Sequence, residues 1–285
     1  MPVAVVTDSS AYLPDGFAAR HAVHVVPLHV LIDDRSGLDG VDIGPAEVAA
    51  ALVGRHTVTT SRPNPDEFVR TYRRLLADGA DGIVSVHLSR ELSGTWESAR
   101  LAAKEVGVDR VRVVDSRTAV MGLGFAVLRA ATAAIGGESG AEVENVAVAA
   151  AARTTTYFVL ETLEYLRRGG RIGSAAAFLG TALAVKPVLH VKDGHIVPLE
   201  KVRTTNRAVA RLVDLAEQAT DATGADSVEL AVHHLAAHDR AVELATRLDE
   251  RISPASGCLV SELGAAIGAH TGPGMLGVVV CPAER

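Results

Sequence analysis

The chain has 285 residues, 48% of them hydrophobic and 22% charged, and this length allows one large hydrophobic core or two of ordinary size. Its net charge of −6, without a lysine–arginine run, argues against nucleic acid as a partner. No signal peptide or apolar run of roughly 18 residues is present, and Cys258 and Cys281 stand in no metal or disulfide spacing, so we expect a cytoplasmic protein without stable membrane insertion.

The first half alternates strands and helices, which favours an α/β domain with a parallel sheet. Short β-branched runs at 3–6, 83–88 and 111–114 are typical of strands buried in such a sheet. Two of them end in small polar side chains, at 7–10 and 115–116, and ligands of α/β proteins bind at that edge of the sheet. The other elements expected here are a strand at 23–32, helices at 45–52, 118–135 and 141–152, and a helix that Asn64 caps with Pro65 in its first position.

The segment 88–99 joins one of these strands to a helix through a Ser-Gly-Thr corner, and we place the ligand there. Ser93 is the expected N-cap of that helix. The amides of Gly94 and Thr95 then belong to the unpaired N–H groups of the first turn, and with the helix dipole they can receive a carboxylate or a phosphate. A serine before a helix is more often only a cap, so both interpretations stay open at this point.

The second half is expected to mix parallel and antiparallel strands. Asp193 and Gly194 between two apolar runs predict a β-hairpin, and the glycines of 168–173 indicate tight backbone packing. No linker separates the halves, so two closely packed α/β domains, residues 1–155 and 156–285, are predicted with a ligand cleft between them. The remaining elements expected are strands at 157–160, 187–191, 195–202, 228–232, 259–260 and 275–280, and helices at 206–219 and 239–252.

Common enzyme and nucleotide-binding signatures are absent from the sequence: there is no phosphate loop, no dinucleotide-binding glycine turn, no His-Glu-x-x-His and no Gly-x-Ser-x-Gly elbow. His233, His234 and His238 come closest to a metal-ligand cluster, but no cysteine or pair of acids accompanies them. We therefore predict neither a metal site nor an enzyme cofactor.

One serine and one histidine stay open as a catalytic pair. Ser93 is a candidate nucleophile if a histidine reaches it, and His270 lies in a glycine-rich segment, 268–274, that we interpret as a flexible loop. The alternative for His270 is a loop histidine that hydrogen-bonds to backbone. The sequence does not separate these interpretations locally.

Seven short motifs stand in a fixed order between residues 7 and 204, and each is weakly specific by itself. They are Thr-Asp-Ser-Ser at 7–10, Thr-Thr-Ser-Arg-Pro at 59–63, Leu-Ser-Gly-Thr at 92–95, Asp-Ser at 115–116, the arginine- and glycine-rich stretch at 168–173, Lys-Pro-Val-Leu at 186–189 and Lys-Val-Arg-Thr at 201–204. Taken together they resemble the DegV family over nearly the whole chain.

DegV proteins include the fatty-acid-binding component of bacterial fatty acid kinase. The resemblance implies an N-terminal three-layer α/β/α domain with a parallel sheet and a C-terminal domain with a mixed sheet, which clasp one long-chain fatty acid in the cleft between them. It also implies that a separate kinase phosphorylates the bound carboxyl group. The chain itself then has no catalytic residue and no cofactor besides the lipid.

The resemblance also assigns residues to the carboxylate site. The family's carboxylate-binding threonine and serine fall on Thr60 and Ser93, and its late histidine falls on His270. Ser61 follows Thr60 in the same motif, and Gly94 and Thr95 complete the corner described above. Hydroxyls, helix amides and an imidazole are all suited to a carboxylate.

Two arginines are implied to meet the phosphate or the kinase. Arg171 and Arg203 occupy the matching positions, and the alternative for each is an ordinary ion pair between the domains. The sequence departs from the family pattern where Arg62 replaces a frequent Gln and Trp96 replaces a usual Tyr. Both departures lie beside the predicted carboxylate site.

A fatty acid also needs an apolar tunnel, since each buried methylene contributes about 0.8 kcal/mol. Residues 178–179 and 182–185 are candidates for its lining, although such residues are first of all core. The leading hypothesis is a non-catalytic fatty-acid-binding protein that presents the carboxyl group to a kinase. The alternative is a hydrolase or acyltransferase that uses Ser93 and His270, and an acidic residue that orients His270 would distinguish it.

Overall fold

The computed structural model describes residues 3–178, 185–252 and 255–283. Its internal contacts divide the chain into two compact units. The first unit combines Met1–His29 with Thr60–Ala152, and the second combines Val30–Thr59 with Arg153–Arg285. A single division at residue 155 does not describe this arrangement, because residues 30–59 make their contacts within the second unit.

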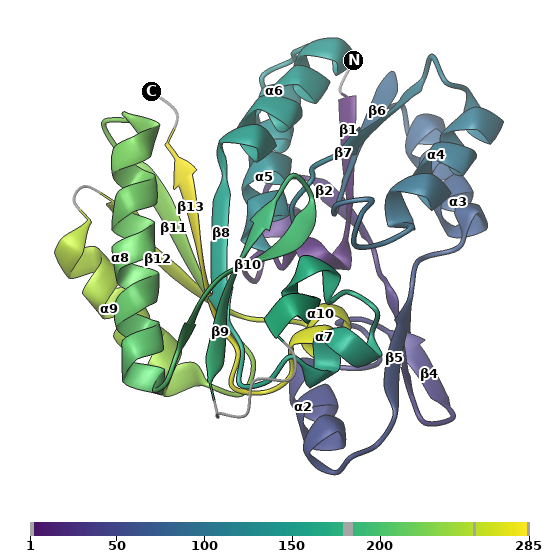
Figure 1. The fold of residues 1–285 in the computed structure, drawn as a ribbon. Coiled ribbons are helices and arrows are strands. Elements are labelled where there is room, and N and C mark those ends of the chain that lie inside the picture. The colour runs from purple at the N-terminus through teal and green to yellow at the C-terminus, as the bar shows by residue number, and fades with distance from the viewer. Residues whose placement is uncertain (1–2, 179–184, 253–254, 284–285) are drawn as a thin grey trace. The chain divides into compact units, whose positions relative to one another are not determined.

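The first unit is built on a sheet of four parallel strands in the order β2-β1-β6-β7. The strands are β1 (Val3–Asp8), β2 (Val23–Val26), β6 (Gly82–His87) and β7 (Val111–Asp115). The helices of this part of the chain are α1 (Phe17–Arg20), α3 (Pro65–Ala77), α4 (Thr95–Val106), α5 (Met121–Ile135), α6 (Gly140–Arg153) and the short 3-10 helix η1 (Ser9–Ala11). Figure 1 shows α3 and α4 on one side of the sheet and α5 and α6 on the other, which confirms the predicted three-layer domain.

Local sequence explains where these elements begin and break. The predicted start of α3 is confirmed, because Pro65 occupies its first turn and the Glu67 side chain accepts the Asn64 amide at 2.7 Å. The single strand predicted at 23–32 is wrong, because Pro27 interrupts it. Proline has no amide for a strand ladder, and β2 ends before it.

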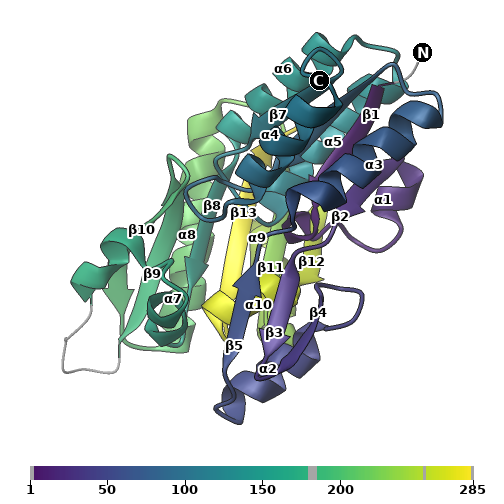
Figure 2. The same cartoon turned by 90° about the vertical axis from the view of Figure 1, so that its right-hand side faces the viewer.

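The second unit contains a six-stranded mixed sheet in the order β10-β9-β8-β13-β11-β12. Its strands are β8 (Thr155–Val159), β9 (Lys186–Lys192), β10 (His195–Val202), β11 (Val228–His234), β12 (Ala255–Glu262) and β13 (Leu276–Pro282). Only β11 and β12 pair in parallel, and the other neighbours are antiparallel, so the predicted mixed sheet is confirmed. Figure 2 shows β8, β13, β11 and β12 side by side.

The helices of the second unit are α2 (Pro45–Val53), α7 (Glu164–Arg168), α8 (Thr205–Thr223), α9 (His238–Arg251), α10 (Ala265–Thr271) and the 3-10 helix η2 (Gly173–Phe178). Aliphatic side chains of α8 and α9 form one core with the buried face of the sheet. None of the helices in the described part of the chain combines the length and apolarity that crossing a bilayer requires.

A small sheet and a hairpin complete the fold. The sheet has the order β4-β3-β5, with β3 (His29–Ile32), β4 (Arg35–Leu38) and β5 (Val58–Ser61). The predicted hairpin between β9 and β10 is confirmed: Asp193 and Gly194 have φ of 53° and 85°, the left-handed pair that a type I′ turn requires.

Candidate functional site

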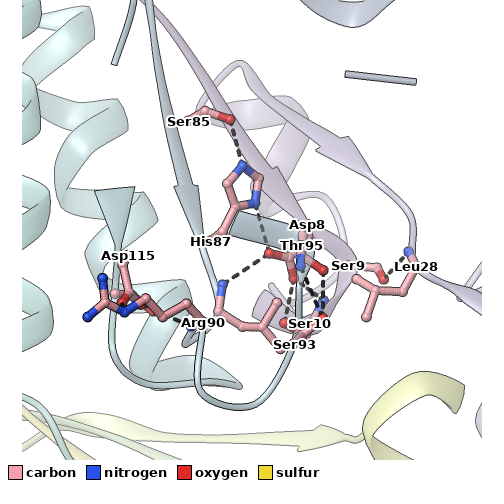
Figure 3. A network of polar contacts seen from close by, with 12 residues as sticks. Asp8, Ser9, Ser10, Leu28, Ser85, His87, Arg90, Ser93, Thr95 and Asp115 are labelled. Atoms are coloured by element: carbon pink, nitrogen blue, oxygen red, sulfur yellow. Dashed lines mark hydrogen bonds and ion pairs between the residues drawn. The ribbon is translucent and has the colours of Figure 1, made fainter. Parts of the chain in front are cut away.

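Polar side chains gather at the carboxyl edge of the parallel sheet in the first unit. Asp8, His87 and Asp115 end three of its strands, and His87 pairs in register with Asp115. Because the carboxyl ends of parallel strands share one edge, the loops that follow them meet there. Figure 3 shows these residues together with Ser93 and Thr95, which lie at the corner between β6 and α4.

Asp8 is completely buried and accepts hydrogen bonds on both oxygens. Its Oδ1 accepts the Ser10 amide at 3.1 Å and the Ser10 hydroxyl, and its Oδ2 accepts the Leu88 amide at 3.1 Å and His87 Nδ1 at 2.9 Å. A buried carboxyl group is stable only when it is hydrogen-bonded in this way. Asp8 therefore fixes the loops that leave β1 and β6.

A chain of hydrogen bonds continues from His87 into the core. His87 Nε2 lies 2.7 Å from Ser85 Oγ, and the Tyr72 hydroxyl donates to Ser85 Oγ at 2.8 Å. Burial raises the pKa of Tyr72 above its ordinary value, so its hydroxyl stays a donor. With Nδ1 donating to Asp8, Nε2 is the acceptor for Ser85.

Ser85, His87 and Asp8 follow the order of a catalytic Ser-His-Asp triad. All three are completely buried, and the edge of the Phe68 ring lies against the imidazole with centroids 5.0 Å apart. A substrate has no access to Ser85 Oγ, so this network is structural. The sequence analysis missed this network. Its only signal in the sequence is the pair of polar residues Ser85 and His87, which lie two positions apart in an otherwise apolar strand.

The Ser-Gly-Thr corner begins α4, but its N-cap is Gly94 rather than the predicted Ser93. The Gly94 carbonyl accepts the first helical hydrogen bond, from the Ser98 amide at 3.0 Å, which defines the cap. Ser93 lies one residue earlier, where its Oγ accepts the Thr95 amide at 3.3 Å and lies 2.9 Å from Thr95 Oγ1. The two hydroxyls therefore lie together at the start of α4. The prediction that the Thr95 amide is unpaired is therefore wrong, because the Ser93 side chain already accepts it.

Arg62 brings the segment after β5 to this corner. Its Nη1 donates to the Gly94 carbonyl at 3.4 Å, and its side chain occupies the space that a Cβ at residue 94 would need. Thr60 and Ser61 end β5 immediately before it. Within the first unit, the Arg62 side chain thus links the predicted Thr60–Ser61 segment to the predicted 93–95 corner.

The arginines around Trp96 differ in their partners. Arg90 and Arg100 lie over the indole ring, with their Cζ atoms 5.7 and 5.5 Å from its centroid. Arg90 pairs with Asp115 and Glu91, and Arg100 pairs with Glu97. Arg62 forms no ion pair with any residue that the structure describes.

In the second unit, His270 lies in the last turn of α10, so the predicted flexible loop is wrong at this position. The helix ends at Thr271, and its C-cap residue Gly272 has a φ of 75°, which glycine adopts more readily than other residues. The imidazole lies directly against Gly169, where a Cβ would collide with its Nδ1. The tight packing predicted for the glycines of 168–173 is thus confirmed at Gly169 and also at Gly173, where a Cβ would lie 3.1 Å from the Ile196 carbonyl oxygen, but not at Gly170, which has open space around it.

Arg171 is the charged neighbour of His270. Arg171 Nη1 donates to the Gly169 carbonyl at 2.6 Å. Burial, and then the positive charge of Arg171, lower the pKa of His270 to about 4. The imidazole is therefore neutral at pH 7, and the positive charge in this part of the second unit belongs to Arg171.

Arg203 is the other arginine predicted to contact the phosphate or the kinase. It follows β10, is exposed and forms no ion pair with a described residue, so no salt bridge in that part of the chain accounts for it.

The remaining candidates from the sequence analysis are the histidines of the second unit and the residues of the predicted tunnel. His234 and His238 line an open cavity of about 1000 Å³ with Glu262 and Arg240, and their rings lie edge to face. Across the described ranges, no three His, Cys, Asp or Glu residues are arranged to hold a metal ion. Of the candidate tunnel residues, 179 and 182–184 lie outside the described residues. Phe178 packs beneath Lys201, whose Nζ lies 4.3 Å from the centroid of the Phe178 ring.

Comparison with known proteins gives consistent relatives over the whole length. Residues 2–283 match the model of the uncharacterised DegV protein family. A DegV domain-containing protein of Streptomyces coelicolor is 54% identical, covering 98% of each chain.

Solved structures agree. One describes fatty acid binding by a DegV family protein of Thermus thermophilus, with a TM-score of 0.94, 36% identity and coverage of 99% of this chain and 100% of that one. DegV of Bacillus subtilis, described as a fatty acid binding protein, has a TM-score of 0.89 and 32% identity over 99% of this chain and 100% of its own. Sequence, fold and the order of the site segments lead to one conclusion: this chain belongs to the DegV family.

Proposed function

We propose that this protein binds a long-chain fatty acid and presents its carboxyl group to a separate kinase, which forms an acyl phosphate. The observation that carries the proposal is the corner at the start of α4, where the Ser93 and Thr95 hydroxyls and the Arg62 side chain lie together at the N-terminal end of the helix. Solved relatives described as fatty-acid-binding proteins support the same ligand class.

The head group is a carboxylate, and its proposed partners suit it. Thr60, Ser61, Ser93 and Thr95 contribute hydroxyls, and the amides of α4 add the positive end of the helix dipole. His270 contributes a neutral imidazole that can donate one hydrogen bond.

We assign phosphorylation to a partner rather than to this chain. The sequence contains no nucleotide-binding motif, so ATP and its metal ion belong to the kinase in this proposal. Arg203 is exposed and has no ion-pair partner among the described residues, which suits contact with a phosphate or with the kinase, and Arg171 lies beside His270. The complex is expected in the cytoplasm.

Mass spectrometry of lipids extracted from the purified native protein tests the ligand. A fatty acid at about one per chain supports the proposal. The intact protein is measured in parallel, because a covalent acyl adduct on Ser93 identifies the alternative hydrolase or acyltransferase. Protein that carries no lipid and also fails to bind an added fluorescent fatty acid refutes the proposal.

A further inference from the structure

The segment 30–59 makes a buried contact with the helix that carries His270. Asp39, in the loop between β4 and α2, is 2% exposed, and its Oδ1 accepts the amide of Ala266 at 3.2 Å. Ala266 is the second residue of α10. The N-cap residue is Gly264, which has no side chain to accept that amide, so the cap of α10 comes from a distant part of the chain.

The same segment packs against the side of α10. Gly268 faces Leu235 and Val48, and a Cβ at residue 268 would lie 3.1 and 3.8 Å from their side chains. Val48 belongs to α2. A helix of seven residues is not stable by itself, so its position depends on such contacts.

The loop around Asp39 is itself held by hydrogen bonds. The Leu38 carbonyl accepts the amides of Val41, Asp42 and Ile43, and the Asp42 side chain accepts the Leu38 amide at 2.9 Å. Asp39 is therefore presented to α10 by a closed turn.

His270 follows Ala266 by four residues, about one helical turn. Its ring lies against the backbone of Gly169, where even a methyl group does not fit, so a small displacement of α10 changes this contact. We propose that Asp39 is a positioning residue that holds His270 in place by fixing the start of α10. The role of His270 as a head-group ligand rests on the proposed function, whereas the coupling of Asp39 to His270 does not.

The first experiment measures the His270 imidazole by NMR during a pH titration of the lipid-free protein, with His270→Gln identifying its signals. In the native protein we expect a midpoint near pH 4, because burial and Arg171 disfavour the charged ring. Asp39→Ala removes the cap, and the midpoint is expected to move up toward the ordinary value of about 6.5. In Asp39→Asn the side-chain oxygen still accepts the Ala266 amide, and the midpoint is expected to stay near 4.

Two further variants separate positioning from general destabilisation. Ala266→Pro removes the same hydrogen bond from the donor side at a first-turn position that tolerates proline, and it is expected to shift the His270 midpoint as Asp39→Ala does. Leu248→Ala weakens the core of the same unit at α9 and is expected to leave the midpoint unchanged. An unchanged midpoint in both Asp39→Ala and Ala266→Pro, or an equal shift in Leu248→Ala, overturns the proposal.

Binding of a fluorescent fatty acid completes the test. Affinity is expected to fall about tenfold in Asp39→Ala, the scale seen when a residue that orients a ligand-binding group is removed, and to recover in Asp39→Asn. If the native protein binds no fatty acid while Asp39→Ala still shifts His270, the proposed function fails and the positioning role stands. If the native protein binds and His270 does not respond to Asp39, the positioning role fails and the proposed function stands.

Discussion

His87 Nδ1 lies 2.9 Å from Asp8 Oδ2, and neither side chain is exposed to solvent. Removing the Asp8 carboxylate leaves His87 Nδ1 and the amides of Leu88 and Ser10 buried without their acceptor, and each unsatisfied buried donor costs about 1–3 kcal/mol. We therefore expect Asp8→Ala to lower the free energy of unfolding by at least about 3 kcal/mol in urea denaturation. Glu105→Ala, which removes an exposed partner of Arg73, is the control and is expected to change it by less than about 1 kcal/mol. Equal losses in both variants contradict the role given to Asp8.

The head-group hydroxyls are tested by Ser93→Ala combined with Thr60→Ala. Hydrogen bonds to a charged group contribute about 1.5–3 kcal/mol each, so affinity for a fatty acid is expected to fall by at least tenfold while the fold is retained. Displacement of a fluorescent fatty acid measures the affinity, and circular dichroism checks the fold. Thr246→Ala removes an exposed helix hydroxyl in α9 and is the matched control. An unchanged affinity in the double variant removes these hydroxyls from the site.

Arg62→Gln is expected to change stability and affinity in opposite directions. A cation beside a helix N-terminus is electrostatically unfavourable, so its removal is expected to raise the Tm of the lipid-free protein slightly. The same change removes a positive charge from the proposed carboxylate site and is expected to weaken binding about tenfold.

The fatty acid methyl ester is the matched ligand control for Arg62, because it lacks the negative charge. Native protein is expected to bind the ester more weakly than the free acid, and Arg62→Gln is expected to leave ester binding unchanged. Calorimetric titration with both ligands measures this. A variant that loses affinity for acid and ester alike places Arg62 outside head-group recognition.

Arg203→Ala separates lipid binding from phosphorylation. Because Arg203 is exposed and unpaired among the described residues, its replacement is expected to change stability by less than about 0.5 kcal/mol. Fatty acid binding is expected to remain, while acyl phosphate formation with the cognate kinase and ATP falls strongly. Formation of product by the isolated protein with ATP alone would show that the chain is itself a kinase.

Acid is expected to destabilise the protein partly through His270. The folded protein holds this imidazole neutral with a pKa of about 4, whereas the unfolded chain takes up a proton near 6.5. The contribution of the neutral His270 to the free energy of unfolding is therefore fully present above pH 6.5. It is lost as the pH falls from 6.5 toward 4, by about 3 kcal/mol in all. His270→Gln is expected to reduce the difference in unfolding free energy between pH 7 and pH 4.5 by about 2 kcal/mol. His233, whose burial also lowers its pKa to about 4, is expected to keep part of the pH dependence in that variant.

Features set by neighbouring residues could be predicted from the sequence. The Asp193–Gly194 turn and the Asn64–Pro65 helix start follow from backbone and capping chemistry within a few positions. The family motifs also place Ser93 and Thr95 at one corner, although the N-cap residue of α4 is Gly94 and not the predicted Ser93.

Features set by distant residues could not be predicted. Glycines before and after His270 resemble a loop, yet the segment is a helix whose cap comes from Asp39, 227 positions away. The Asp8–His87 pair joins residues 79 apart, and a histidine in an apolar strand gives no sign of its partner. The first depends on how a loop packs against a helix and the second on the pairing of β1 with β6, and both are properties of the whole fold.

The division of the chain has a consequence for its synthesis. Residues 30–59 are translated long before residues 153–285, with which they share their unit. During elongation the first unit can complete its parallel sheet once residue 152 has left the ribosome, whereas β4, α2 and the Asp39 loop wait for the C-terminal half. A fragment that ends near residue 155 therefore contains segment 30–59 without the part of the second unit that it packs against. A fragment that begins there lacks Asp39, which caps α10. Neither half of the chain is therefore expected to fold as an independent module.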